Sequence, residues 1–180
     1  DEVIGYGSKV YLRGLKAAET YNKMRRSDPQ VDSALKAVIL PIKAATWSIE
    51  AEDETTKAFL EEALFKRLNW KEGVLHHLLL AVQYGFEVME KVYFIDNGQM
   101  WYKKLGHRAA STIDTWHVDR ETGELGGIRQ ESVWKGGFYQ SIDIPAGSGL
   151  KPDPEEAKLK LLHIAIDMEG NNYEGISMLR

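Results

Sequence analysis

The hydrophobic pattern of this 180-residue chain changes its period once, at the Gly-Phe pair at positions 85–86. Before that pair, apolar residues recur every three to four positions, which is typical of one buried face of an α-helix. After it, apolar and polar residues alternate, as they do on strands with one buried face. Helices that precede strands along the chain favour an α+β fold with an antiparallel sheet. We therefore predict an α+β fold in which N-terminal helices pack on a mostly antiparallel sheet of hairpins.

Local signals place the elements of the helical half. An Asp-Pro pair at 28–29 predicts a helix start, and Pro41 should kink or end that helix because it lacks an N–H. Two further helices are predicted over 53–69 and 71–85, the second ending at its glycine. Between the first helix and these two, the alternating segment ATWSIEAED at 45–53 predicts a short strand.

The strand half contains one strong turn signal. Asn97-Gly98 is the dipeptide that most favours a two-residue hairpin, and it divides the segment 86–106 into two strands. A second hairpin is predicted over 113–131, turning at RETGE. Further strand candidates lie at 133–147 and 158–167, separated by a Gly- and Pro-rich segment that predicts a loop.

The chain shows no internal repeat and no interdomain linker, so one main domain is predicted. Its first residues are mixed in pattern and include an early glycine cluster. We therefore divide the chain into an N-terminal arm and short helix, 1–27, and an α+β domain, 28–180.

Composition excludes several functional classes. The net charge is −4, from 27 acidic and 23 basic residues, so the chain lacks the basic footprint of duplex-binding domains. It contains no cysteine, which excludes disulfides and thiolate metal sites. No run approaches the ~18 consecutive apolar residues of a membrane span. We predict a soluble protein that is not embedded in a membrane.

The sequence offers no catalytic, cofactor-binding or metal-ligating motif. His76 and His77 are adjacent, so on a helix their rings point about 100° apart, and the spacing of zinc peptidases is absent. The other histidines fall in different strand regions, and the acids of the strand half lack calcium-loop spacing; these residues are His107, His117, His163, Asp114, Asp119 and Asp143. The glycine turns lack the spacing of a P-loop. We expect no cofactor and no enzyme activity, but an α+β hydrolase with a site assembled from scattered Asp and His residues remains an alternative.

The strand half is rich in aromatic residues, which suit either a sheet core or a stacking platform for single-stranded nucleic acid. The platform also needs a positive groove. The aromatic residues are Trp101, Tyr102, Trp116, Trp134, Phe138 and Tyr139, and the local basic residues are Lys103, Lys104, His107 and Arg108. A single-strand-binding module is therefore a second alternative.

The last residues resemble the opening of another element. Ser177 can act as an N-cap, its hydroxyl accepting from an early backbone N–H, yet only Met178, Leu179 and Arg180 follow it. Fewer residues remain than one helical turn requires.

Three stretches, taken in order, resemble the portal proteins of tailed phages, particularly the Mu-type branch. They are SDPQVDSALKAVILPIKAATWSIEAED, LHHLLLAVQYGFEVMEKVYF and KLLHIAIDMEGNNYEGISMLR. The family's Tyr-Gly-Phe-x-x-x-Glu strand corresponds to positions 84–90, and its turn close to Gly-x-Ser-x-Leu-Arg to positions 175–180. The resemblance covers 28–180 and is weakest over 111–149.

The resemblance implies a structural subunit rather than an enzyme. Portal subunits form a ring, usually of twelve, at one capsid vertex of the virion. The terminase packaging motor docks on the ring, double-stranded DNA passes through it without sequence specificity, and tail adaptor proteins attach later. Assembly in the cytoplasm of the host bacterium is implied. The resemblance also implies that this chain is the wing region, truncated before the channel-lining helices, and that alone it associates only weakly.

Overall fold

A computed structural model describes residues 13–135, 138–145, 152–168, 170 and 172–179, without the side chains of 132–140. Its elements are, in chain order, α1 (Gly14–Ser27), α2 (Pro29–Ala44), α3 (Glu54–Glu61), the π-helical turns η1 (Glu62–Arg67) and η2 (Trp70–Leu75), α4 (His76–Leu78), α5 (Leu80–Tyr84), β1 (Phe86–Asp96), β2 (Gln99–Arg108), the 3₁₀ turn η3 (Ala110–Thr112), β3 (Ile113–Val118), β4 (Leu125–Lys135), β5 (Phe138–Ile144), α6 (Pro154–Lys160) and β6 (Leu161–Ala165).

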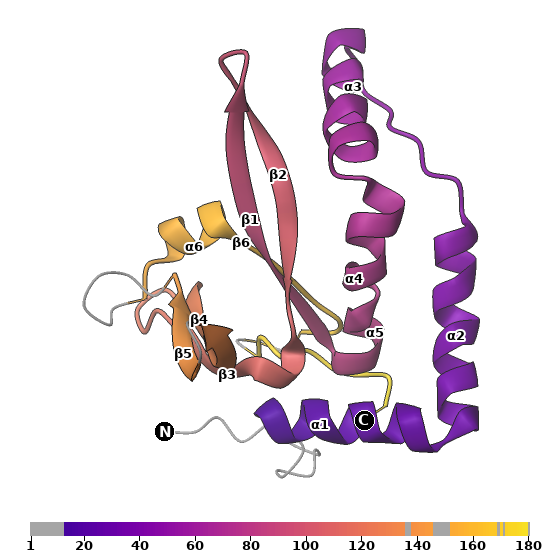
Figure 1. Cartoon of the computed structure of the whole chain (residues 1–180), viewed down its shortest axis with the longest axis vertical. Helices are drawn as coiled ribbons and strands as arrows, with labels where there is room; N and C mark the ends of the chain where they lie inside the picture. Colours follow the sequence, from indigo (N-terminus) through magenta and orange to yellow (C-terminus); the bar gives the residue numbers. More distant parts are fainter. Residues whose placement is uncertain (1–12, 136–137, 146–151, 169, 171, 180) are drawn as a thin grey trace.

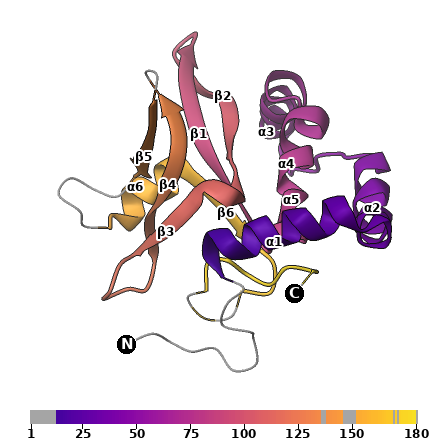
Figure 2. The same ribbon diagram turned by 60° about the horizontal axis from the view of Figure 1, so that its bottom comes forward.

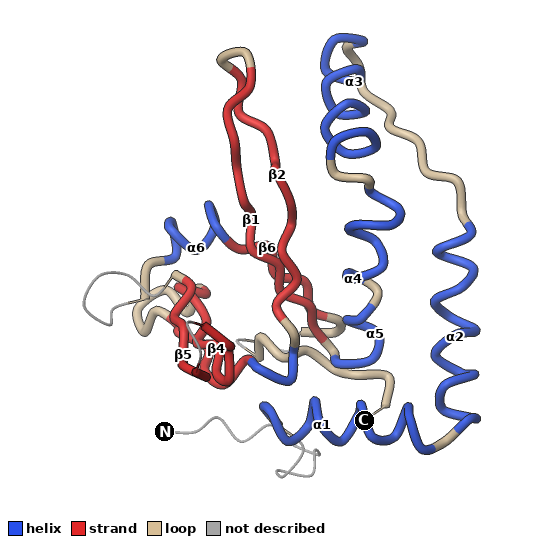
Figure 3. Tube along the Cα trace, viewed as in Figure 1, coloured by secondary structure: helices blue, strands red, loops and turns tan. Residues whose placement is uncertain are grey.

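Two long projections rise side by side from a common base (Figure 1). One is the β1–β2 hairpin, and the other is the helical column that runs from α3 down to α5. Helix α1 crosses the base, and α2 stands on the far side of the column from the hairpin, as a second view confirms (Figure 2). The strands β3, β4 and β5 form a separate layer on the side of the hairpin that faces away from the helical column (Figure 3).

The described strands form two sheets of three, ordered β2-β1-β6 and β3-β4-β5, and every pairing is antiparallel. The predicted α+β class is therefore confirmed. The sheet is split where η3 turns the chain out of β2 and into β3. Helices in the first half and antiparallel hairpins in the second follow the period change in the sequence.

The strongest turn signal produces the turn that the sequence predicts. Asn97 and Gly98 both have a left-handed backbone, with φ of 51° and 76°, as a type I′ hairpin turn requires. The register pairs Asp96 with Gln99 directly across this turn. The second predicted hairpin also forms, between β3 and β4.

The helix signals are also confirmed, with one difference. The Asp28 carboxylate accepts a hydrogen bond from the Gln30 backbone N–H at 2.8 Å, and Gly85 ends α5 with a φ of 92°. Helix α2 continues past Pro41 and ends at Ala44. A proline in the last turn removes only one hydrogen bond, so the helix can continue for a few more residues.

Two predictions about elements are wrong. Residues 45–53 do not form a strand; they connect α2 to α3 along the outside, and no strand of the described part lies beside them. The predicted loop contains α6, which the Asp153 carboxylate caps by accepting from the Glu156 N–H at 3.1 Å. The strand predicted over 158–167 consequently begins only at Leu161. Asp153-Pro154 repeats the Asp-Pro signal at 28–29, so this helix start was visible in the sequence.

Two buried clusters hold the layers together. The larger joins both sheets to α1 and includes Ala18, Val88 and Ile128, the last two fully buried. The smaller joins the helical column to the first sheet and centres on Met89. The larger cluster fixes the relative position of the two sheets, and the smaller one fixes the column against the hairpin.

Replacing Ile128 with alanine should lower the free energy of unfolding by about 2–5 kcal/mol, because the removed methyl groups leave a cavity between the sheets. Urea unfolding measures this loss. The matched control is Ile95→Ala, at a side chain that is 76% exposed, which should change stability by no more than about 0.5 kcal/mol. Equal losses at both positions would contradict the assigned core.

Candidate functional site

The two motif segments around Gly85 and Gly175 lie far apart in sequence but meet at the base of the first sheet. The described residues of 166–179, here called the C-terminal strap, run beneath β1 and α5 (Figure 1). The Ile166 N–H donates to the Gly85 carbonyl at 2.8 Å, and the Met178 N–H donates to the Val82 carbonyl at 3.2 Å. The strap is therefore bonded to the point where the chain changes from helix to strand.

Ser177 forms the centre of this contact. It is buried, its hydroxyl donates to the Gln83 carbonyl at 2.5 Å, and it accepts from the Leu179 N–H at 2.9 Å. The sequence predicted that this hydroxyl accepts from an early N–H, and the bond from Leu179 forms, within a turn at residues 178–179. The donor bond to α5 was not predicted, because the sequence does not show which carbonyl lies opposite.

The strap backbone lies so close to Gly85 that neither Gly85 nor Gly175 has room for a side chain. A Cβ on Gly85 would lie 2.5 Å from the Glu174 carbonyl oxygen, and one on Gly175 would lie 2.4 Å from the Gly85 carbonyl oxygen. Gly175 also has a left-handed φ of 57°. Glycine at both positions allows the two backbones to touch.

Other strap residues reach the remaining layers. The Glu174 carboxylate accepts from the Gly14 N–H at 3.0 Å, which attaches the first turn of α1. The Tyr173 hydroxyl donates to the Gly123 carbonyl at 2.6 Å, in the turn between β3 and β4. The cavity between α1 and the strap has a volume of about 20 Å³, which suits a single water molecule rather than a substrate.

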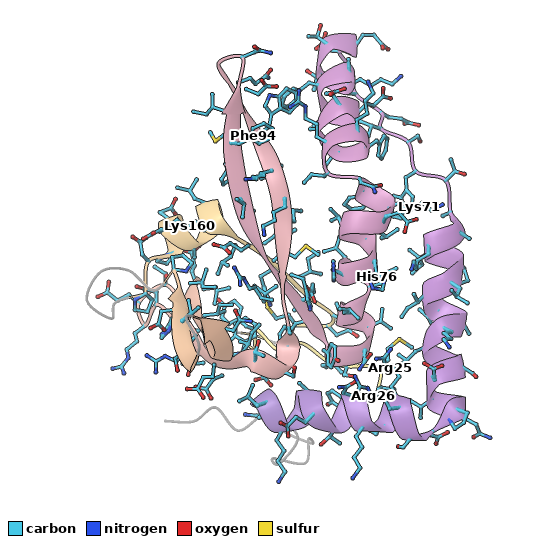
Figure 4. The ribbon with its side chains drawn as sticks, in the orientation of Figure 1. Arg25, Arg26, Lys71, His76, Phe94 and Lys160 are labelled. Carbon is cyan, nitrogen blue, oxygen red and sulfur yellow. The ribbon has the colours of Figure 1, made fainter. Side chains whose placement is uncertain are left out.

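The structure brings together three polar residues that the sequence did not connect. The His77 ring on α4 stacks on the His107 ring of β2, with centroids 4.6 Å apart. His107 Nδ1 lies 2.5 Å from Oε1 of Glu87, whose side chain is almost completely buried. His76 instead faces α2, where its Nδ1 lies 3.4 Å from the Lys43 ammonium (Figure 4). The two adjacent rings contact different partners, but their centroids lie only 5.3 Å apart with the planes tilted by 59°, so the predicted divergence of the rings is wrong.

Burial dominates the electrostatics of this cluster. It raises the pKa of Glu87 despite the hydrogen bond from His107, which acts in the opposite direction. Burial also lowers the pKa of His77, and the neighbouring His107 and His76 lower it further. Among the described residues, no group of three or more His, Asp or Glu side chains is arranged to hold a metal ion.

The remaining histidines make separate contacts. His163 on β6 donates from Nε2 to the Tyr173 carbonyl at 2.8 Å, and burial lowers its pKa. His117 lies 2.9 Å from Asp143, which also accepts from Arg129 at 3.2 Å. Burial opposes ionisation of Asp143, but these two hydrogen bonds outweigh it and lower its pKa.

The other acids named in the sequence analysis have local roles. Asp114 accepts from the Thr115 hydroxyl, and Asp119 accepts from the Thr122 backbone N–H within the β3–β4 turn. Neither joins a histidine in the described structure. Among the described residues, these Asp and His side chains therefore lie at separate places, apart from the His117–Asp143 and Glu87–His107 contacts.

The aromatic residues with described side chains pack within the fold. Trp101 is buried against Phe59, with centroids 4.9 Å apart, and Trp116 packs on Phe86 and stacks on Tyr173. These contacts support the sheet-core interpretation. The side chains of Trp134, Phe138 and Tyr139 lie outside the described part.

The local basic residues do not form a continuous groove. His107 contacts Glu87, and Arg108 is ion-paired with Glu90. Only Lys103 and Lys104 are exposed and have no ion-pair partner among the described residues. A single-strand-binding surface would require a longer unpaired basic track.

Comparison with protein families agrees with this geometry. The family model described as the portal protein of Mu bacteriophage matches residues 18–180 and therefore includes the strap and the segment that it contacts. The chain belongs to this family of Mu-type phage portal proteins. No curated protein matches it. None of the described helices has the length and apolar character needed to cross a bilayer.

Replacing Gly175 with alanine should lower the free energy of unfolding by about 2–5 kcal/mol. The estimate combines about 1–2 kcal/mol for a left-handed Cβ with about 1–3 kcal/mol for overpacking against Gly85 and Ile166. Chemical denaturation measures the loss.

Gly170 provides a matched control for this substitution. Its φ of 58° is nearly the same as that of Gly175, yet a Cβ there would meet nothing within 4 Å. Gly170→Ala should therefore show only the conformational cost of about 1–2 kcal/mol. If both variants lost the same stability, the close contact with Gly85 would contribute nothing.

His163 should make the protein less stable as the pH falls. Its pKa is lowered by burial in the folded state, so the unfolded chain binds the proton more readily and acid favours unfolding. His163→Gln keeps a donor for the Tyr173 carbonyl but cannot titrate. We expect the free energy of unfolding of the wild type to fall relative to this variant between about pH 7.5 and pH 5.5. Parallel curves would contradict a buried, neutral His163.

Proposed function

We propose that this chain is the wing part of a portal subunit, a structural component of the ring at one capsid vertex. The observation that carries the proposal is the family match over residues 18–180. The match includes both motif segments, and the strap bonds them to each other through Gly85 and Ser177. In this proposal residues 28–180 are the wing-like domain, and 1–27 are an accessory arm and helix.

The charge of the chain suits a wall along which DNA moves. Twenty-seven acidic residues oppose 23 basic ones, so phosphate is repelled rather than held, and no base is read. We propose that double-stranded DNA passes the ring without sequence specificity during packaging and ejection. The partners are further copies of the subunit in a ring, the terminase motor, the capsid and tail adaptor proteins. The location is the virion, after assembly in the bacterial cytoplasm.

The described cavities favour a mechanical role over catalysis. The cavity beneath α1 has room for one water, and the open groove of about 410 Å³ beside the hairpin is lined by Arg67, Phe94, Tyr102 and Lys103. The groove is large enough for a ligand, but this lining provides neither a carboxylate base nor a hydroxyl nucleophile activated by a histidine. The subunit contributes shape and charge in this proposal, and no bond is made or broken.

Deleting the coding region of this chain from its phage or prophage should leave heads without packaged DNA. The intact coding region supplied in trans should restore packaging, measured as nuclease-protected DNA in purified particles. Normal packaging without the chain would overturn the portal role.

A double variant separates the portal proposal from the hydrolase alternative. His117→Asn with Asp143→Asn removes a His-Asp pair of the kind that hydrolytic chemistry would use, at a cost of about 1 kcal/mol, because the Asp143 side chain is exposed although His117 is half-buried. This variant should restore packaging as well as the wild type does. A folded variant that failed to restore packaging would favour chemistry at this pair.

A further inference from the structure

Two unlike surfaces lie on opposite sides of the helical column. The first is the hairpin groove, the open depression of about 410 Å³ lined by Arg67, Phe94, Tyr102 and Lys103. Figure 4 shows Phe94 on the upper part of the hairpin. The second is the acidic connector, residues 45–53 between α2 and α3, which runs along the outside of the column (Figures 1 and 2).

The hairpin groove combines aromatic walls with positive charge. Phe94 and Tyr102 supply the apolar surface, and the Arg67 guanidinium lies 5.9 Å from the Phe94 ring centre. Arg67 is neutralised by Asp96, at 3.1 Å, and by Glu62. Lys103 is the extra residue of a β-bulge and has no residue opposite it on β1. Both Lys103 and its neighbour Lys104 are exposed, and neither has an acidic partner among the described residues. The groove therefore has an apolar floor and an uncompensated positive rim.

The acidic connector presents the complementary features. Trp47 rests edge-on against Trp70, with ring centroids 5.6 Å apart, yet 42% of its surface is exposed. Glu50 and Glu52 follow on the same extended segment, both exposed and without a basic partner among the described residues. An exposed tryptophan beside unpaired acids suits an aromatic groove that is lined by the unpaired Lys103, with Lys104 next to it in sequence.

These surfaces cannot meet within one molecule, because α3 and η1 stand between them (Figures 1 and 2). We propose that the acidic connector of one copy docks in the hairpin groove of the next, with Trp47 against the aromatic walls and Glu50 and Glu52 beside Lys103 and Lys104. This contact joins two different surfaces, so it is head-to-tail, the kind of interface that closes into a ring by rotation. The inference rests on the proposed portal function and specifies which surfaces of the subunit form the contact.

Cysteine cross-linking can test the contact directly, because the chain has no cysteine of its own. Protein carrying Ser48→Cys, next to Trp47, is mixed with protein carrying Met100→Cys, on the exposed tip of the hairpin, and treated with a short bismaleimide. The mismatched control replaces Ser48→Cys with Gln30→Cys, at the opposite end of α2. The Ser48–Met100 mixture should give several-fold more heterodimer than the control, and equal yields would overturn the proposed contact.

Exchanging the charges tests the same contact from a second direction. The double variant Lys103→Glu, Lys104→Glu makes the groove side acidic, so that it repels the acidic connector. The double variant Glu50→Lys, Glu52→Lys makes the connector basic, so that it repels the lysines of the groove. Each double variant should lower the association constant about tenfold or more. Mixing the two reversed proteins pairs opposite charges in both orientations of the heterodimer, one with the exchanged charges and one with the wild-type charges. The cross-link is therefore placed in the exchanged orientation, with Met100→Cys in the Lys103→Glu, Lys104→Glu protein and Ser48→Cys in the Glu50→Lys, Glu52→Lys protein, and the cross-linked heterodimer should be recovered. Failure to recover it in folded proteins would overturn the charge pairing. The portal role stands or falls separately, on the packaging experiment.

Discussion

The close contact between the backbones at Gly85 and Gly175 is the constraint on which the rest of the structure depends. It occurs where the helical column ends and β1 begins, and the absence of side chains lets the strap bond to both. From this point Glu174 reaches α1 and Tyr173 reaches the second sheet. A few backbone and side-chain hydrogen bonds thus connect layers that the two hydrophobic clusters hold together. Partly buried bonds of this kind resist distortion, because leaving their partners unsatisfied costs about 1–3 kcal/mol each.

At the base, the strap bonds to α1, to α5 and to the turn between β3 and β4. Above the base, the hairpin and the helical column contact each other directly through their side chains. In the upper part of this contact, the Arg67 guanidinium lies 4.1 Å from the Trp101 ring centre and pairs with Asp96. Arginine suits this position because its planar group can stack on an aromatic ring and bind a carboxylate together. The hairpin and the column are thereby held as a pair.

The sequence was most informative where a local signal determines local geometry. Asn97-Gly98 and Asp28-Pro29 each specify a conformation through a few neighbouring atoms, and both predictions are confirmed. The strand prediction over 45–53 failed because alternation shows only that a segment suits a sheet, and none of the described strands lies beside this segment. Asp153-Pro154 carried the same signal as the first Asp-Pro pair, but the surrounding glycines and prolines suggested a loop. The bond from Ser177 to α5 and the stack of His77 on His107 depend on tertiary proximity, which a single sequence does not encode locally.

The buried contact between Glu87, His107 and His77 costs folding free energy, because polar groups are taken out of water. One Glu87 oxygen and Nδ1 of His77 have no hydrogen-bond partner in the described structure, and burial opposes the charged forms of both residues. An apolar contact at this position would be about as stable or more so. It would also be less directional, since apolar contacts such as those of Leu68, Val74 and Met89 set no hydrogen-bond geometry. The bond from His107 to Glu87 and the ring stack are directional, so together they set the height of α4 against β2. That height sets where the acidic connector and the hairpin groove lie relative to each other, since the connector rests on the column through Trp47 and Trp70 and the groove lies beside the hairpin.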